Sequence, residues 1–386
     1  MRNIYNSFVK LKKKRSFPNL RRAELHLTDR CNLGCYFCNQ ADLRKKRLSE
    51  LPYNVIVETL EQMRTIGLRE VRLSGGGEPT LHPSFKKIIE YLYSRDITLR
   101  DLTTNGVLCD RPIIDLLCSG RWLAVEFSLH AVDVKDWTSI TLGSRKDFQR
   151  TIDNIRYLAE KKRSSKSPCP RIILQIGIDE RTYKKLFKSY EMACDLGVDH
   201  LTFITYNFIT YPRNVLSAGD KILDQLRAIK ADARLRKRKM LVSYGLSNIK
   251  LNISAVQDAV ISGSGNEIVC IEDYCSPCFM PWHGVTIKAN GDVVACCAGF
   301  VPSIMGNIYD APIKSIWLGS KYRDLRSRFE KVLRAKNIDM TNLPIHISCT
   351  PFARPDEGCP VKIRWEDLVK FHSIRDPAGA MKGGYQ

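Results

Sequence analysis

The sequence lacks the long apolar stretch that a membrane-spanning helix needs. Its longest apolar stretch, around Val293 to Val301, is far too short to cross a bilayer, and no continuous apolar run follows the basic N-terminal segment. Acidic residues are scarce beside basic ones, 41 against 61, and the formal net charge is +20. No internal repeat is present beyond an alternation of strand and helix patterns. We therefore expect a cytoplasmic protein with no transmembrane segment.

The excess positive charge is spread over separate runs. These runs cover residues 10–15, 44–47, 161–166 and 234–239. A basic field attracts nucleic acid, phosphorylated metabolites or acidic peptides. Because the runs lack interleaved aromatic residues and no recognisable RNA-binding module is present, we do not expect nucleic acid to be a partner.

Short strand patterns alternate with helix patterns from residue 23 to about 235. Strictly alternating or extended apolar patterns occupy residues 23–27, 71–73, 97–103, 123–129, 172–178 and 201–205. Apolar residues recur at helical spacing in residues 56–66, 85–92, 112–118, 148–158, 183–193 and 222–233. Strands joined by helices pair in parallel through right-handed crossovers. The expected fold class is therefore α/β, with a partial (β/α)6 barrel whose chemistry collects at the C-terminal strand ends.

The pattern changes after Cys270, where cysteines, glycines and short strands replace the regular alternation. Asn290-Gly291 is a strong hairpin-turn signal. We expect a smaller Cys-rich α+β domain after the barrel. The expected parts are a basic N-terminal segment (1–22), the barrel (23–235), a linker (236–269), the second domain (270–372) and a tail (373–386).

Three of the 14 cysteines stand close together directly after the first expected strand. Cys31, Cys35 and Cys38 form a C-x3-C-x2-C arrangement, which lets three thiolates converge on one centre. A four-iron cluster held in this way has one iron without a protein ligand. The alternative is zinc, which usually shows paired C-x2-C units or a nearby fourth ligand, whereas the nearest histidine, His26, precedes the loop. Cys109, Cys118, Cys169 and Cys194 stand alone, and we expect small buried apolar residues there.

A second motif follows the second expected strand. It reads Ser74-Gly75-Gly76-Gly77-Glu78-Pro79. Consecutive glycines let the backbone approach a ligand closely and offer it amide and carbonyl groups.

Together these two motifs resemble the radical SAM superfamily, whose signature is a C-x3-C-x-aromatic-C loop followed by a GGEP-like turn. The resemblance implies a 4Fe-4S cluster on Cys31, Cys35 and Cys38, with S-adenosyl-L-methionine chelating its open iron. It implies that Phe37 packs on the adenine and that the glycine turn contacts the methionine moiety. The cofactor-binding residues expected from it are Phe37, Gly75, Gly76, Gly77, Glu78, Asn105, Ser128, His130 and Gln175.

The C-terminal part resembles the SPASM or shorter twitch extension of this family. Cys278 is followed by Gly291 and Cys296 at a G-x4-C spacing, and Cys349 and Cys359 complete four ligands for one auxiliary 4Fe-4S cluster. The C-x2-C-x5-C-x3-C block of the full SPASM set is absent, which favours one auxiliary cluster over two. Zinc on the same four thiolates is the alternative.

The resemblance implies an enzyme that cleaves S-adenosylmethionine reductively to a 5′-deoxyadenosyl radical, which abstracts hydrogen from a substrate. We expect a small polar metabolite, such as a sugar, aminocyclitol or nucleotide-linked sugar, and net oxidation or epimerisation. Cys297, next to Cys296, is the candidate hydrogen donor for epimerisation. The expected electron donor is a flavodoxin or ferredoxin.

Two other functions stay open. The first is maturation of a ribosomally made peptide, although only 22 residues precede the first strand, too few for a leader-binding domain. The second is a non-enzymatic metal- or nucleic-acid-binding protein, which the open fourth position of the cysteine loop argues against.

Overall fold

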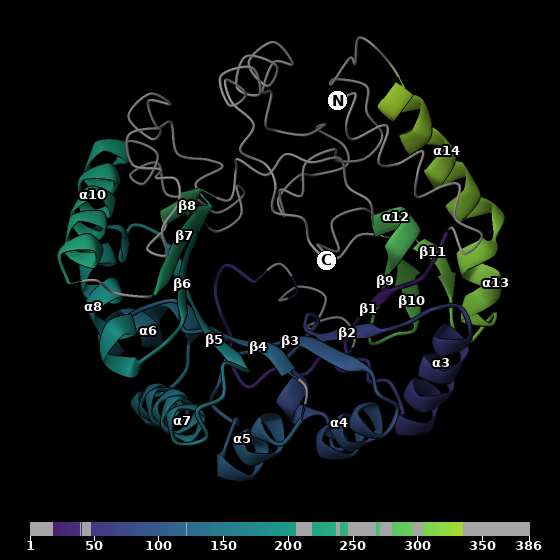
Figure 1. The fold of residues 1–386 in the computed structure, drawn as a ribbon, viewed down its shortest axis with the longest axis horizontal. Coiled ribbons are helices and arrows are strands. Elements are labelled where there is room, and N and C mark those ends of the chain that lie inside the picture. Colours follow the sequence, from purple (N-terminus) through teal and green to yellow (C-terminus); the bar gives the residue numbers. More distant parts are fainter. Residues whose placement is uncertain are drawn as a thin grey trace.

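The computed structural model describes residues 18–38, 40, 48–120, 122–205, 218–236, 240–245, 268–270, 280–295 and 304–334. They contain one 11-stranded sheet with the strand order β11-β10-β9-β1-β2-β3-β4-β5-β6-β7-β8 (Figure 1). The strands are β1 (Arg22–Leu25), β2 (Glu70–Leu73), β3 (Thr98–Thr104), β4 (Trp122–Ser128), β5 (Arg171–Ile178), β6 (His200–Thr205), β7 (Leu241–Gly245), β8 (Ile268–Cys270), β9 (Gly284–Ile287), β10 (Asp292–Val294) and β11 (Ile304–Asn307).

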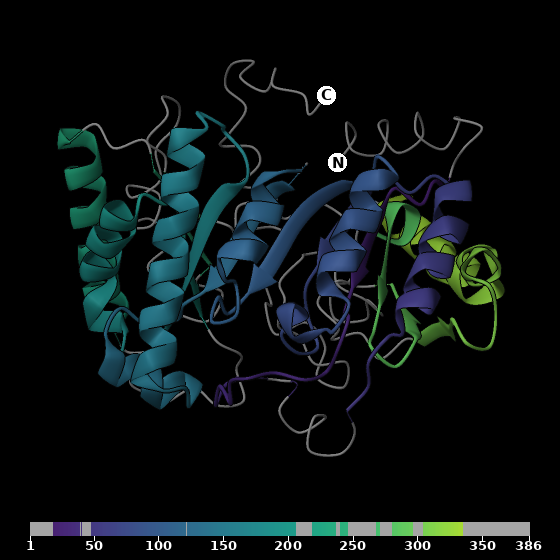
Figure 2. The same ribbon diagram turned by 90° about the horizontal axis from the view of Figure 1, so that it is seen from below.

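Helices cover the convex side of this curved sheet, as Figures 1 and 2 show. The α-helices are α3 (Tyr53–Thr65), α4 (Phe85–Ser94), α5 (Arg111–Cys118), α6 (Val134–Thr141), α7 (Arg145–Ser164), α8 (Leu186–Leu196), α10 (Gly219–Leu235), α12 (Met280–His283), α13 (Ile313–Leu318) and α14 (Ser320–Arg334). Two short 3-10 turns, η1 (Pro79–Leu81) and η2 (Tyr183–Lys185), follow β2 and β5. No helix among the described residues is long and apolar enough to cross a membrane.

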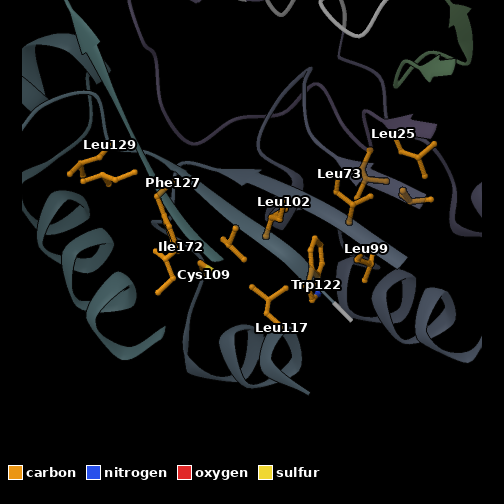
Figure 3. Close-up of a cluster of buried hydrophobic side chains, with 14 of the residues drawn as sticks. Leu25, Leu73, Leu99, Leu102, Cys109, Leu117, Trp122, Phe127, Leu129 and Ile172 are labelled. Carbon is orange, nitrogen blue, oxygen red and sulfur yellow. The ribbon is translucent and has the colours of Figure 1, made fainter. Parts of the chain in front are cut away.

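The hydrophobic core lies between the sheet and these helices. Successive strand side chains point to opposite faces, so every second residue of β1 to β6 points toward the helices. Figure 3 shows Leu25, Leu73, Leu102 and Phe127 of four neighbouring strands lining this layer, and each is at most 2% exposed. Burying one such side chain contributes about 1.5–3 kcal/mol. This layer is what holds the strand ends, and the loops after them, in fixed positions.

The six strand–helix units expected from the sequence are present, and the α/β fold class is confirmed. The expected hairpin is also present, because β9 and β10 pair antiparallel across a turn in which Gly291 has φ +85°. Cys109 is fully buried in the core, as expected, whereas Cys118, Cys169 and Cys194 are only partly buried.

Three features differ from the sequence-based expectation. Residues 236–269, expected as a linker, contain β7 and all but the last residue of β8, and these two strands extend the sheet in parallel beyond β6. Their short strands have too few alternating residues to stand out from the sequence. The helix α6 is also additional; it spans only eight residues, and Asp133 caps its N-terminus.

The third difference is that the sheet continues from the barrel into the C-terminal part. β9 pairs in parallel with β1, with Arg22 opposite Gly284 and Leu25 opposite Ile287. A pairing between residues more than 250 positions apart leaves no local sequence signal. The boundaries of the expected domains stay a prediction.

Candidate active site

The cysteine loop leaves the C-terminal end of β1 and is held by backbone hydrogen bonds to α6. The Gly34 amide donates to the Thr141 carbonyl oxygen (2.8 Å), and the Tyr36 amide donates to that of Ile140 (3.1 Å). Cys31, Cys35 and Cys38 are partly exposed, and none is in a disulfide. The loop therefore presents three thiols from a backbone that is held against α6 at Gly34 and Tyr36.

The glycine turn after β2 lies directly against the cysteine loop. The amides of Gly77 and Glu78 donate to the carbonyl oxygens of Thr28 and Arg30, both at 2.7 Å. A Cβ on Gly77 would lie 1.8 Å from the Arg30 oxygen, so no side chain fits there. Gly75 has φ +71°, a conformation that L-residues rarely adopt. The two motifs that stand far apart in the sequence are thus one interlocked unit.

The Glu78 carboxylate accepts hydrogen bonds from neighbouring residues of the chain. Its oxygens accept hydrogen bonds from the Thr104 hydroxyl (2.7 Å), the Asn105 amide (2.8 Å) and the amide and hydroxyl of Thr80 (3.2 and 2.7 Å). Burial raises the pKa of this carboxyl, and the hydrogen bonds that it accepts oppose the rise. The Glu78 side chain therefore ties the glycine turn to the end of β3, and its expected cofactor contact stays a prediction.

Asn105, just after β3, reaches back to the cysteine loop. Its side-chain nitrogen donates to Asn32 Oδ1 (2.7 Å) and lies 3.9 Å from the sulfur of Cys31. Its side-chain oxygen accepts from the Val107 amide (3.0 Å). An amide donor near a thiolate favours the charged sulfur that binds metal.

Phe37 and His130 come together from different parts of the chain. Their rings meet edge to face, with centroids 4.7 Å apart. His130 follows β4 with φ +66°, and its amide donates to the Gln175 carbonyl oxygen of β5 (3.0 Å). Burial lowers the pKa of His130 to about 3, so its imidazole is neutral at physiological pH. The expected adenine-packing residue therefore borders a neutral ring at the end of the fourth strand.

Tyr36 is a site residue that the sequence did not single out. Its hydroxyl donates to Asp179 Oδ2 (2.8 Å), and the guanidinium of Arg181 lies 4.8 Å from the centre of its ring. Asp179 is fully buried just past β5 and also pairs with Arg181 (2.9 Å). Burial and the Asp179 carboxylate raise the pKa of Tyr36. The sequence feature that could have indicated this contact is the position of Asp179, an acidic residue directly after the apolar strand β5.

The concave face of the sheet carries charged and polar side chains. Arg72 of β2 lies 2.7 Å from Asp101 of β3 and 3.9 Å from both Glu24 of β1 and Glu126 of β4. Gln175 of β5 donates to Glu126 Oε1 (2.8 Å). Ser128, at the end of β4, stands opposite Gln175 in the register. Gln175 therefore belongs to this inner wall together with charged residues that the sequence did not single out, and the expected cofactor contacts of Gln175 and Ser128 stay predictions.

No three His, Cys, Asp or Glu side chains among the described residues are arranged to hold a single metal ion. The thiolates of a cluster bind different iron corners, so they stand further apart than the ligands of one ion. Cys278, Cys296, Cys297, Cys349 and Cys359 lie outside the described residues, so their expected roles stay predictions.

Arg326 of α14 is a buried charged residue among the described residues of the C-terminal part. It is 6% exposed and lies over the rings of Trp317 (4.2 Å) and Tyr322 (4.9 Å). Its Nε donates to the Pro281 carbonyl oxygen (2.7 Å). Burying a cation costs several kcal/mol, and a desolvated cation–π contact returns about 2 kcal/mol.

Two protein-family profiles match the chain. The radical SAM superfamily profile matches residues 25–215, and an iron–sulfur cluster-binding (SPASM) profile matches residues 278–340. The chain belongs to the radical SAM superfamily. A 4Fe-4S cluster and S-adenosyl-L-methionine are therefore its cofactors, and the SPASM-type region adds an iron–sulfur centre.

Curated relatives of this radical SAM protein include GTP 3′,8-cyclases. The Synechocystis enzyme is 33% identical over 123 residues, which cover 32% of this chain and 37% of that protein. The probable GTP 3′,8-cyclase of Sulfurisphaera tokodaii is 26% identical over 287 residues, covering 73% of this chain and 82% of the relative. The match to the first of these relatives thus spans well under two thirds of its length.

Solved structures share the fold. SuiB of Streptococcus suis, bound to S-adenosylmethionine, aligns with a TM-score of 0.59 at 17% identity. The alignment covers 84% of this chain and 70% of SuiB. At this identity the similarity shows the fold alone, and it confirms the radical SAM architecture expected from the sequence.

Proposed function

We propose that the chain cleaves S-adenosylmethionine reductively and that the resulting radical abstracts a hydrogen atom from a small polar metabolite. The observation that carries the proposal is the interlock of the cysteine loop with the glycine turn through the Gly77 and Glu78 amides. It brings the cluster-binding and methionine-binding motifs of the family to one place at the C-terminal strand ends.

The residues of the chain have distinct roles in this proposal. Cys31, Cys35 and Cys38 hold the cluster, and the Asn105 amide group supports the Cys31 thiolate. Phe37 and His130 form the wall against which the adenine packs. When bound, the cluster and S-adenosylmethionine supply a 5′-deoxyadenosyl radical that removes hydrogen from the substrate. The protein positions the target C–H bond and excludes other hydrogen donors.

The inner wall supports a polar substrate. Arg72, Glu24, Asp101, Glu126 and Gln175 offer charged and hydrogen-bonding groups, which match hydroxyl, amino or amide groups rather than an apolar chain. Relatives named as GTP 3′,8-cyclases are consistent with a nucleotide or sugar-like molecule. We propose such a metabolite, with a flavodoxin or ferredoxin as the electron donor.

Peptide maturation is the second candidate. The observation in its favour is the SPASM-type match combined with the fold of SuiB, which has been crystallised with its precursor peptide SuiA. The auxiliary centre would then accept an electron from a peptide radical.

The test is anaerobic formation of 5′-deoxyadenosine by the iron-reconstituted chain with dithionite. We expect slow formation without substrate, and faster formation with GTP, a nucleotide sugar or an aminocyclitol. Acceleration by a peptide alone would favour the second candidate. No 5′-deoxyadenosine under any condition would overturn the proposed function.

The matched control uses two cysteines with different roles. Cys35→Ala should abolish 5′-deoxyadenosine formation, because it removes a cluster ligand. Cys118→Ala should retain it, because Cys118 lies at the end of α5, on the convex side.

A further inference from the structure

Leu142 is an exposed leucine in a backbone conformation that leucine rarely adopts. Its side chain is 69% exposed, and its φ of +55° is left-handed. It ends α6, where a left-handed residue is usually glycine, because the Cβ of other residues costs roughly 1–2 kcal/mol there. An exposed leucine also lacks the about 1.5–3 kcal/mol that burial of its side chain would contribute. Stability alone therefore does not explain a leucine at this position.

The turn that contains Leu142 packs on the cysteine loop. A Cβ on Gly34 would lie 3.2 Å from Leu142 Cδ1, and a Cβ on Gly143 would lie 2.8 Å from Leu33 Cδ2. Leu33 and Gly34 both lie between the first and the second cysteine of the loop. Leu142 is therefore an exposed side chain in direct contact with the loop that binds the first cluster.

The helix after this turn begins with exposed cations. Arg145 and Lys146 are exposed at the first two positions of α7, and Arg150, one turn further, is 64% exposed. Cations in the first turn of a helix are disfavoured by roughly 0.3–1 kcal/mol each, because the positive end of the helix dipole lies there. The acidic residue of this turn, Asp147, forms a capping box with Ser144. The start of α7 therefore presents positive charge to solvent at a cost to the helix.

We propose that Leu142, Arg145, Lys146 and Arg150 form the docking surface for a small acidic electron-transfer protein that reduces the first cluster. Electron transfer slows steeply with distance, and this surface adjoins the loop that binds the cluster. A basic surface steers an acidic partner toward it and makes the association depend on salt. An apolar side chain beside exposed charges suits the small, short-lived interfaces of electron-transfer proteins.

The chemistry of the step is the transfer of one electron. The reduced group of the donor is oxidised, the cluster is reduced, and no bond forms or breaks. The proposal rests on the first cluster and the electron donor of the proposed function. It does not depend on which substrate the chain acts on.

The first test reverses the charge at the start of α7 with Arg145→Glu and Lys146→Glu together. The probe is flavodoxin, and its binding to the iron-reconstituted chain is measured by isothermal titration calorimetry at low and high salt. We expect about tenfold weaker binding at low salt than in the wild type, and a smaller effect of salt. Reduction of the cluster by reduced flavodoxin, followed by stopped-flow absorbance, should slow, whereas reduction by dithionite should not. The melting temperature should not fall, because acidic residues suit the first turn of a helix.

The matched control reverses two charges further along the same helix, with Arg156→Glu and Arg163→Glu together. Both residues are exposed, and they lie about 17 Å and about 27 Å beyond Arg145 along the helix axis. This variant should bind flavodoxin as the wild type does. An equal loss of binding in the two double variants would show that net charge alone attracts flavodoxin, and this result would overturn the proposal.

The second test is Leu142→Gly, which removes the apolar contact and suits the left-handed backbone. We expect weaker flavodoxin binding at low and high salt, with no loss of thermal stability. Its control is Leu235→Gly at the end of α10, where the leucine is 83% exposed and flavodoxin binding should be unchanged.

Unchanged flavodoxin binding in either test variant would contradict the proposed surface. A wild-type chain that binds neither flavodoxin nor ferredoxin at low salt would also contradict it. Binding and cluster reduction are both measured without S-adenosylmethionine. Failure of this proposal is therefore distinguishable from failure of the proposed function, which is tested by 5′-deoxyadenosine formation with dithionite.

Discussion

Gly77 is the residue at which the two motifs of the site touch most closely. Its amide donates to the Thr28 carbonyl oxygen, and its missing side chain leaves room for the Arg30 carbonyl. Sequence reasoning placed this glycine near the cofactor, whereas the structure shows that it also sets the spacing between two loops.

Gly77→Ala should weaken both loading of the cluster and binding of S-adenosylmethionine. The new methyl group would lie 1.8 Å from a backbone oxygen, so one loop must move. Iron content and equilibrium dialysis of S-adenosylmethionine under anaerobic conditions measure the effect. The control is Gly197→Ala at the end of α8, where φ is +71° and the nearest atom to a Cβ is 3.6 Å away. It should cost about 1 kcal/mol of stability and leave both readouts unchanged. Equal binding in the two variants would contradict the interlock.

His130 should make folding stability depend on pH. Its pKa in the folded chain, about 3, lies below the usual value of 6.5, so the unfolded chain binds one more proton between those values. Stability is therefore lost as the pH falls from about 6.5 toward 3, at no more than about 1.4 kcal/mol per pH unit. His130→Asn removes this contribution, and asparagine tolerates the left-handed backbone. Urea unfolding should show the wild type losing about 2 kcal/mol more than this variant between pH 7 and pH 5. Equal losses of stability in the wild type and in His130→Asn would show that His130 is not buried as a neutral ring.

At the scale of strands and helices, periodicity explains what the sequence could predict. β1 to β6 were recognisable because their apolar residues alternate above one continuous core layer. β7 and β8 are short, and the parallel pairing of β9 with β1 depends on residues distant in the chain. The loop motifs could be recognised in the sequence because their residues are close together along the chain. The Tyr36–Asp179 hydrogen bond could not be recognised, since it joins residues 143 positions apart.

The charged residues of the inner wall could not be predicted from the sequence either, because single charged residues in different strands have no common spacing along the chain. A register shift between Val71 and Arg72 places Asp101, rather than Arg100, opposite Arg72. This bulge brings the carboxylate within 2.7 Å of the guanidinium. The wall is thus a product of sheet register and not of any local motif.

Arg72→Met should destabilise the fold by on the order of 2 kcal/mol, because it leaves three carboxylates close together without their cation. The loss should be larger at pH 8 than at pH 5, since burial raises the pKa values of Asp101 and Glu126 and these groups take up protons first. Adding Asp101→Asn should restore part of the stability. Arg100→Met, at a side chain that is 42% exposed, should cost less than about 1 kcal/mol. Urea unfolding of the wild type and the three variants measures this, and equal losses for Arg72→Met and Arg100→Met would exclude a coupled inner wall.

At the scale of the whole molecule, one sheet joins the two matched regions. β9 pairs with the whole length of β1, and the cysteine loop follows the C-terminal end of β1. The strand that presents the first cluster therefore also anchors the region of the second iron–sulfur centre.

The central claim is that Cys31, Cys35 and Cys38 hold a cluster with one iron open to S-adenosylmethionine. The most direct measurement is the electron paramagnetic resonance spectrum of the reduced, reconstituted chain before and after S-adenosylmethionine is added. The account predicts a change in the cluster signal on addition, and no such change in Cys35→Ala, where only the auxiliary centre remains. A wild-type spectrum that is the same with and without S-adenosylmethionine, or a loop that holds only zinc, would contradict the claim.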